Sequence, residues 1–301
     1  MEALPDNPIL EFNPDTLRDV RRQFHLEDVT KIHESVDLIE AWLQKQEHHV
    51  KKDYPRSYLE RAIIFNKGSV ERAKVKIDNI CKFRALLPQY FGKYERKDKL
   101  KVDALLPRLT PDHERVYFLR NRHKKFDEGL FYYFKYLAQY LQAHDYNNGF
   151  ILVCDYMDAD IYELFKVINI VELKQTMTIE GYCMRIKGVH ILSKSRGIDM
   201  IVKIFKQILS EKLSDRIMVH KTLDTLYDFI PKHVLPIEYG GTEKSLDTLC
   251  ENNLNEITSA AFEEYLEETS KAVTIEKLRH DTNSNTEFNG LSGTFRSLTI
   301  D

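Results

Sequence analysis

Several features that mark common classes of enzyme, membrane protein and secreted protein are missing from this sequence. No G-x-G-x-x-G, Walker A, H-E-x-x-H or G-x-S-x-G pattern occurs. No apolar run approaches the roughly 20 residues that span a bilayer, and the first residues carry prolines and acids where a signal peptide would be apolar. The cysteines lie far apart without a C-x-x-C spacing, which argues against a disulfide framework or zinc site and favours a reducing cytosol; they are Cys81, Cys154, Cys183 and Cys250.

The charge of the chain is nearly balanced. Its formal net charge is -3, so no overall positive field attracts nucleic acid, and any site for an anionic partner must be local. A length of 301 residues with 43% hydrophobic residues can bury a substantial core. Composition does not set the oligomeric state, for which we expect a monomer.

The middle of the chain alternates between strand-like and helical patterns. Strand-like runs at 116–120, 150–156, 186–192 and 216–220 alternate with helical stretches at 129–144, 160–179 and 196–209. Strands that alternate with helices of a dozen residues predict an α/β fold with a mostly parallel sheet. The near-continuous apolar run at 150–154 is typical of a strand covered on both faces.

The segments before and after this region are predicted to be helical. We expect one helix capped by Thr30, a short one at 58–65 and one capped by Ser69. A further helix is expected at 256–269, after Gly241. The two apolar stripes predicted to be buried in the first and third helices are Ile32, Val36, Ile39 and Leu43, and Ala73, Ile77 and Ile80.

Three fragments in order and spacing resemble one known family. KGVHIL, ILSEKLSDRI and IPKHVLPIEYGG are similar to the C-terminal half of the CRAL-TRIO lipid-transfer family, and YLERAIIF resembles its preceding helical lobe. The resemblance runs from about residue 58 to residue 241. It implies an N-terminal helical lobe at 1–95, a CRAL-TRIO lipid-binding domain at 96–250 and a C-terminal helix and tail at 251–301 that pack on the body.

The family resemblance also implies an apolar ligand site. Tyr132, Tyr136 and Tyr140 share one stripe of a helix at i, i+4 and i+8, which is typical either of ordinary packing on the sheet or of a pocket wall with a few hydroxyls. The rings at 132 and 136 are larger than the residues that other family members have there, which would reshape the cavity. Carried over by resemblance as further ligand contacts are Phe150, Leu152, Cys154, Met177, Ile186 and Val189.

The amphipathic helix at 198–209 resembles the mobile gate of the family. Its apolar face would cover the ligand when closed and enter a membrane interface when open; the alternative is a helix fixed on the sheet. Residues 193–197 are a candidate hinge, and Lys203 and Lys206 suit anionic headgroups. The apolar face consists of Ile198, Ile201, Val202 and Phe205.

Four cations match the family's cleft for phosphoinositide headgroups: Arg61, Lys187, Lys212 and Arg216. A phosphate cluster needs several converging cations, because each contact alone is weak and screened. Lys212 and Arg216 lie four residues apart around a helix end and can converge. The alternative is a set of separate surface charges that Glu211 and Asp215 neutralise.

Two further groups of polar residues are candidates for chemistry. His190 and Asp155 lie on neighbouring strands, but no nucleophile with a matching motif accompanies them, so we expect no enzyme activity. His48 and His49 end a helix and are adjacent, so they are expected to point to different faces as solvated charges and not to bind a metal.

The sequence therefore predicts a cytoplasmic carrier that associates peripherally with anionic membranes. It would hold a small hydrophobic lipid such as a retinoid, tocopherol, carotenoid or similar terpenoid, with no other cofactor and no nucleic-acid partner. The alternative is a phosphoinositide-binding membrane adaptor whose cavity is vestigial, and a third possibility is an enzyme acting on small apolar substrates.

Overall fold

The computed structural model describes residues 4–88, 91–92, 101–126, 132–167, 185–208 and 210–279. Met177, the helical stretch beyond residue 167 and the tail after residue 279 lie outside these ranges, as does the side chain of Tyr132. The predictions made for them therefore stay predictions.

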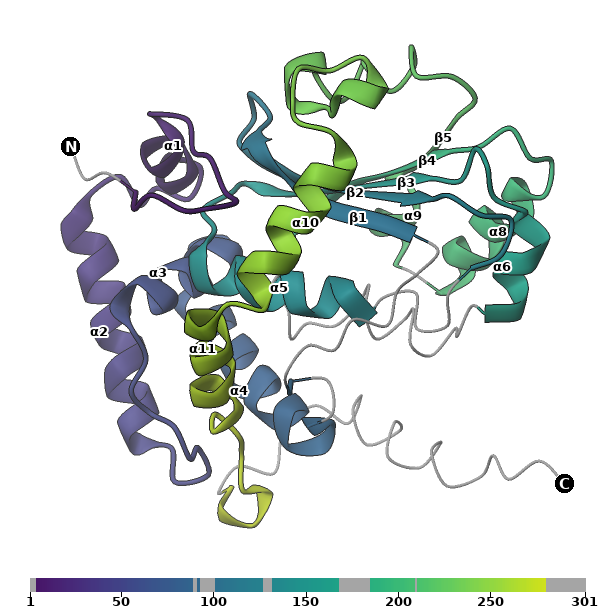
Figure 1. The fold of residues 1–301 in the computed structure, drawn as a ribbon. Helices are drawn as coiled ribbons and strands as arrows, with labels where there is room; N and C mark the ends of the chain where they lie inside the picture. Colours follow the sequence, from purple (N-terminus) through teal and green to yellow (C-terminus); the bar gives the residue numbers. More distant parts are fainter. Residues whose placement is uncertain are drawn as a thin grey trace, which may run out of the picture.

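The sheet at the centre has the strand order β1-β2-β3-β4-β5 (Figure 1). Its strands are β1 (Lys101–Leu109), β2 (Glu114–Asn121), β3 (Gly149–Asp155), β4 (Ile186–Leu192) and β5 (Ile217–His220). Strands β2 to β5 pair in parallel, which confirms the predicted fold class. The antiparallel edge strand β1 was not predicted, and Pro107 within it is tolerated because an edge strand can spare a donor.

Different layers cover the two faces of the sheet. Helices α5 (Tyr132–His144), α6 (Ile161–Val167) and α8 (Ile198–Ile208) lie on one side, and the chain after β5 arches over the other (Figure 1). On the first side, the ring of Phe150 of β3 packs at a tilt against the ring of Phe134 of α5, with centroids 5.7 Å apart. On the other side, the ring of Phe118 of β2 packs against the ring of Tyr239, with centroids 4.2 Å apart. Tyr239 belongs to η4 (Ile237–Tyr239), which follows η3 (Lys232–Val234).

The helices before the sheet form a second apolar cluster. They are α2 (Val29–Lys45), α3 (Arg56–Phe65) and α4 (Val70–Leu86), and both predicted stripes are buried. Helix α1 (Thr16–Arg22) precedes them and packs in a third, smaller cluster with Ile64 and Tyr146. Ser69 caps α4 as predicted, with its hydroxyl accepting from the Arg72 amide at 3.3 Å. The cap of α2 is Asp28 and not Thr30, because the Asp28 carboxylate accepts the amide of Thr30 at 2.9 Å.

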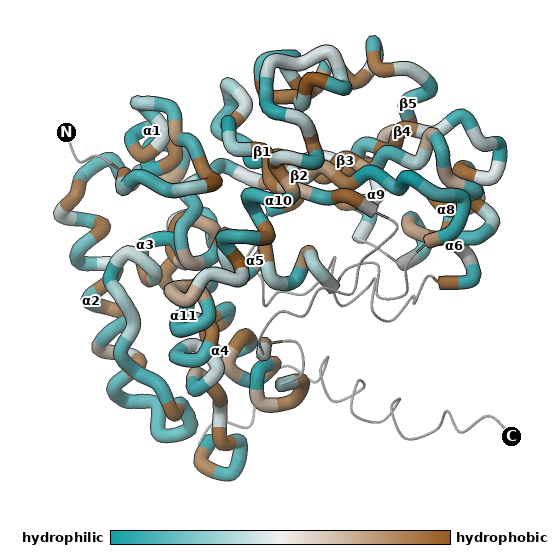
Figure 2. Tube along the Cα trace, in the orientation of Figure 1, coloured by the Kyte–Doolittle hydropathy of each residue, from teal (hydrophilic) through white to brown (hydrophobic). Residues whose placement is uncertain are grey.

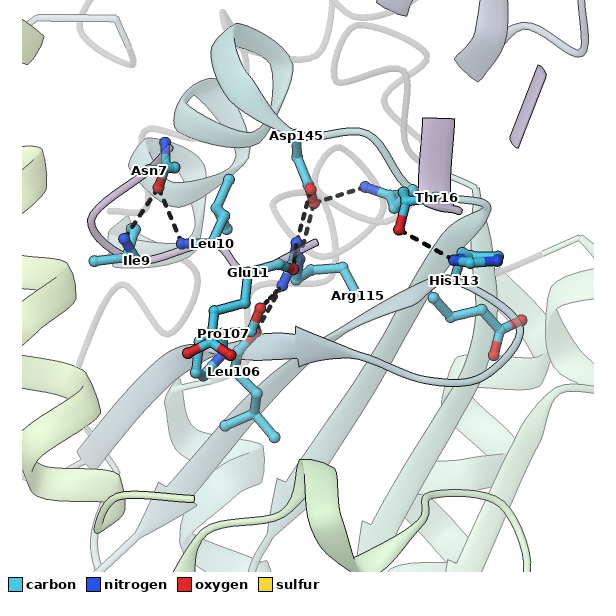
Figure 3. Close-up of polar contacts among 12 residues, drawn as sticks. Asn7, Ile9, Leu10, Glu11, Thr16, Leu106, Pro107, His113, Arg115 and Asp145 are labelled. Carbon is cyan, nitrogen blue, oxygen red and sulfur yellow. Dashed lines mark hydrogen bonds and ion pairs between the residues drawn. The ribbon is translucent and has the colours of Figure 1, made fainter. Parts of the chain in front are cut away.

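A buried ion pair joins the N-terminal segment, the sheet and α5 (Figure 3). Arg115 of β2 pairs with Asp145, and both side chains are fully enclosed, with Nη2 2.9 Å from Oδ1 and Nε 3.0 Å from Oδ2. Arg115 also donates to the carbonyls of Leu106 at 3.1 Å and Glu11 at 3.3 Å. One guanidinium therefore fixes the end of α5 and the N-terminal segment to the same strand.

The C-terminal region differs from its prediction. The structure has two helices, α10 (Leu246–Ile257) and α11 (Ala260–Ser270), and the helix predicted at 256–269 corresponds to α11, whereas α10 was not predicted. Ser259 caps α11, because its hydroxyl accepts a hydrogen bond from the Phe262 amide. Helix α10 covers the sheet edge, where Asn253 accepts the β1 amide of Leu105 at 2.7 Å. The short η5 (Glu276–Leu278) follows.

The prediction of solvated histidines at the end of α2 is wrong. His48 and His49 are 5% and 2% exposed, because α2 ends at Lys45 and the two residues lie in a turn against α4. Figure 2 shows apolar residues concentrated along the strands of the sheet, with a more mixed pattern in the helices around them.

Candidate functional site

The two faces of the central strand β3 are packed differently. Leu152 and Cys154, on the face turned toward α5, keep 9% and 7% of their surface accessible, although β3 has a neighbouring strand on each side. Val153 on the opposite face keeps none. Phe150, the third residue on that side, keeps 2%, so accessible surface is retained over only part of the face that the sequence assigned to a ligand.

Helix α5 contributes the aromatic stripe. Tyr136 and Tyr140 are each 1% exposed, so both are enclosed. The Tyr140 hydroxyl lies 3.1 Å from Glu256 of α10 and is hydrogen-bonded to Asn7, and its ring packs on Phe262 at 5.1 Å. These contacts direct Tyr140 toward α10, α11 and the N-terminal segment.

Helix α8 turns one side to the apolar core. Ile198 and Ile201 are buried, at 4% and 0% exposure, while Val202 and Phe205 are partly buried and pack against the same core, which includes Val189 and Ile191 of β4. Ile186 at the start of β4 is also partly buried against it.

The solvent side of this region carries exposed apolar groups. Met200 of α8 and Tyr162 of α6 are 51% and 59% exposed. A side chain added at Gly197 would come within 3.3 Å of the Tyr162 ring, so the start of α8 lies against α6. With Lys203 and Lys206 on α8, this surface combines apolar and basic residues in the way that membrane-interface helices do.

Five cations from separate segments form what we call the basic cluster: Lys67, Arg72, Arg185, Lys212 and Arg216. The pKa of Lys67 is lowered, first by the charge of Lys212, then by burial and by the other three cations. Among the residues that the structure describes, none of the five lies within 4.0 Å of a carboxylate oxygen, Glu211 and Asp215 included, although the charge of Glu114 acts on Arg185. Converging cations of this kind favour a multivalent anion.

Backbone and ring contacts hold part of the cluster in place. Arg216 donates to the Ile186 carbonyl, and Arg185 lies over the ring of Phe24 at 5.2 Å and contacts Asn148 at 3.3 Å. Helix α9 (Glu211–Ser214), which carries Lys212, follows α8 almost directly. The cluster therefore lies beside the C-terminal end of the helix that resembles a gate.

The other two cations predicted for the cleft have additional partners. Lys187 forms an ion pair with Glu114 at 3.4 Å. Its side chain packs directly against Gly149, because a Cβ atom added at Gly149 would lie only 2.5 Å from the Cγ atom of Lys187. Arg61 is 6% exposed, donates to the Gln142 carbonyl at 3.0 Å and lies over the Tyr146 ring. Sequence spacing gave no signal for Lys67, Arg72 or Arg185, because the fold alone brings them to Lys212 and Arg216.

His190 and Asp155 are bound to different partners. His190 Nδ1 lies 2.9 Å from Nε2 of His220, and burial, followed by the charge of His220, lowers the pKa of His190 to about 4. The Tyr239 hydroxyl donates to Asp155 at 2.7 Å, and Arg120 lies 3.8 Å away. Both groups therefore hold β5 and the segment after it, which includes Tyr239, against the rest of the sheet.

The model of the CRAL/TRIO domain matches residues 108–241, a range that contains strands β2 to β5, helix α8 and the arch. This part of the chain is therefore similar to a CRAL/TRIO domain. The matched range includes three of the cations in the basic cluster, Arg185, Lys212 and Arg216, whereas Lys67 and Arg72 come from the helices that precede it.

Similar curated proteins carry one name. The chain is 27% identical over 271 residues to an "Alpha-tocopherol transfer protein-like" protein of Mus musculus, covering 80% of this chain and 76% of that one. Proteins of the same name from Pongo abelii and Homo sapiens are 26% identical over 276 residues, covering 81% of this chain and 78% of theirs.

A solved structure titled "Crystal structure of Sfh5" shares 13% identity at a TM-score of 0.43, covering 82% of this chain and 98% of that one, a likeness too low to carry an argument. Within the described ranges, no helix combines the length and the apolar character needed to cross a membrane.

Proposed function

We propose that this protein is a cytoplasmic carrier that encloses one small hydrophobic molecule between the sheet and α8 and exchanges it at membrane surfaces. The observation that carries the proposal is the accessible surface that Leu152 and Cys154 keep on the α5 side of β3, inside a sheet covered on both faces. A cargo in that position would gain about 25 cal/mol for each Å² of apolar surface withdrawn from water.

The family and the relatives support the choice of cargo class. The CRAL/TRIO match and the relatives named for α-tocopherol transfer favour a tocopherol, retinoid, carotenoid or similar terpenoid. The ligand contacts proposed for the described part of the chain are Tyr136, Tyr140, Phe150, Leu152, Cys154, Ile186, Val189, Ile198, Ile201, Val202 and Phe205, and Tyr132 and Met177 complete the set.

Membrane contact is the second part of the proposal. The basic cluster would bind an anionic headgroup such as a phosphoinositide. The family resemblance assigns Lys187 and Arg61 to the same headgroup site. Headgroup binding would bring the exposed Met200 and Tyr162 to the interface, where the apolar side of α8 can partition into lipid. No catalytic step belongs to this mechanism.

The alternative function is a phosphoinositide-binding adaptor with a vestigial cavity. The observation that favours it is the basic cluster itself, whose five cations have no carboxylate oxygen within 4.0 Å among the described residues. Both functions predict binding to anionic vesicles, so only the cargo distinguishes them.

Extraction of the purified full-length protein with organic solvent, followed by mass spectrometry, separates the two functions. A carrier releases about one equivalent of a hydrophobic molecule, and Leu152→Trp, which fills the space beside β3, reduces that amount. An adaptor releases no stoichiometric lipid and takes up none from vesicles, yet still binds them. That second result would refute the carrier.

A further inference from the structure

Two adjacent histidines and an aspartate converge outside residues 108–241, the range that the CRAL/TRIO model matches. His48 Nε2 lies 2.8 Å and His49 Nε2 3.0 Å from the same oxygen, Oδ1 of Asp78 on α4. The three possible ligand atoms all lie within 4.8 Å of one another. The side chains are 6%, 0% and 15% exposed, so the group is largely shielded from water.

The Asp78 oxygen accepts more donors than it has lone pairs. Oδ1 receives both imidazoles and also Nη2 of Arg279 at 3.0 Å, while Oδ2 receives Nη1 of Arg279 at 3.0 Å. Three donors on one carboxylate oxygen crowd its two lone-pair directions. An ion that accepted lone pairs from both Nε2 atoms and from Oδ1 would replace these two hydrogen bonds, and each Nε2–H proton would move to Nδ1 or be released to solvent.

We propose that His48, His49 and Asp78 form a binding site for a divalent transition-metal cation, with Zn²⁺ as the best match. Zn²⁺ binds imidazole nitrogen and carboxylate oxygen at about 2.1 Å in tetrahedral geometry, which places ligand atoms about 3.4 Å apart. The two separations from Oδ1, 2.8 and 3.0 Å, therefore need to open by about half an ångström.

The surroundings fix the two rings in advance. The His49 ring packs edge-on against Trp42 at 5.5 Å and tilts against His48 at 4.6 Å. Their backbone is tied to the segment after α11, because the Ile275 amide donates to the His48 carbonyl at 2.8 Å and the Val50 amide to the Val273 carbonyl at 3.1 Å. Ligands held in this way lose little freedom on binding a metal.

Arg279 competes with the metal for Asp78. Two cations on one carboxylate repel each other, so the metal takes Oδ1 at the cost of the Arg279 contact there. The guanidinium keeps a second carboxylate, because Glu276 accepts from its Nε and Nη2, each at 2.9 Å. Metal binding therefore loosens the attachment of residues 273–279 to α4 without leaving Arg279 unpaired.

Zn²⁺ titration of the untagged, EDTA-treated full chain tests the site, with Co²⁺ absorption as a readout of tetrahedral coordination. We expect one equivalent to bind, at least 100-fold weaker binding in Asp78→Asn, and about tenfold tighter binding in Arg279→Gln, which removes the competing charge. The Arg279→Gln gain requires a folded protein, so misfolding cannot imitate it.

The second carboxylate-histidine group, Asp15, Asp19 and His113, supplies the matched control. Asp19→Asn is expected to leave Zn²⁺ affinity unchanged. The proposal is overturned if the wild-type chain binds no Zn²⁺, if Asp78→Asn binds as tightly as wild type, or if Asp19→Asn and not Asp78→Asn abolishes binding.

Discussion

Replacing Lys67 by Gln is expected to weaken membrane binding while leaving the fold intact. Lys67 is exposed in the turn after α3, and the structure surrounds it with four other cations of the basic cluster. Each basic residue near an anionic surface contributes about 1 kcal/mol to binding, so the loss of one predicts about fivefold weaker partitioning. The substitution also relieves repulsion from Lys212, so the free energy of unfolding is unchanged or rises by a few tenths of a kcal/mol after solvent screening.

Flotation or sedimentation with vesicles that contain phosphoinositide measures the partitioning, and urea unfolding measures stability. Lys31→Gln on α2 is the matched control, an exposed lysine outside the basic cluster. The difference between the two variants should shrink as salt rises. Equal binding by Lys67→Gln and Lys31→Gln at low salt would show that the basic cluster does not face the membrane.

The remaining predictions concern the headgroup contacts, the core and pH. The double variant Lys212→Ala and Arg216→Ala is expected to lose selectivity for anionic vesicles, and binding that persists unchanged contradicts the headgroup assignment. Asp145→Asn leaves the fully enclosed Arg115 without its carboxylate and should cost about 3 kcal/mol in urea unfolding, which a loss below 1 kcal/mol would contradict. The folded protein keeps His190 neutral, with its pKa lowered to about 4 from an unfolded value of 6.5. The unfolded chain therefore takes up the proton first as pH falls, and stability decreases by up to about 3 kcal/mol between pH 7 and pH 4. His190→Gln should flatten that part of the profile, and an equally steep profile would show that other groups cause the decrease.

Periodicity in the sequence was sufficient for the elements with a strong, uninterrupted pattern. The α2 stripe ending at Leu43 and the apolar run of β3 were predicted because burial on one or both faces leaves a direct signature. Strand β1 was missed because it is an edge strand that contains Pro107 and a register shift between Leu105 and Leu109. At the C-terminal end the helix predicted at 256–269 corresponds to α11, and α10 was missed.

The candidate site was predictable only in part, and its cations show why. Lys212 and Arg216 are close in sequence, so their convergence follows from local geometry. Arg185 reaches them through the pairing of β4 with β5, and Lys67 through the tertiary packing of the turn after α3, neither of which a spacing rule encodes. His48 and His49 were misjudged for a related reason, because α2 ends before them and the turn directs both rings to Asp78.

The central claim is exchange of an enclosed hydrophobic molecule at an anionic surface. The most direct measurement is the rate at which the protein, loaded with its co-purified molecule, delivers it to acceptor vesicles as their phosphoinositide content rises. We predict a rate that increases with phosphoinositide in wild type and stays low and flat in the Lys212→Ala and Arg216→Ala double variant. A wild-type rate that does not exceed spontaneous transfer between vesicles, at any headgroup content, would contradict the account.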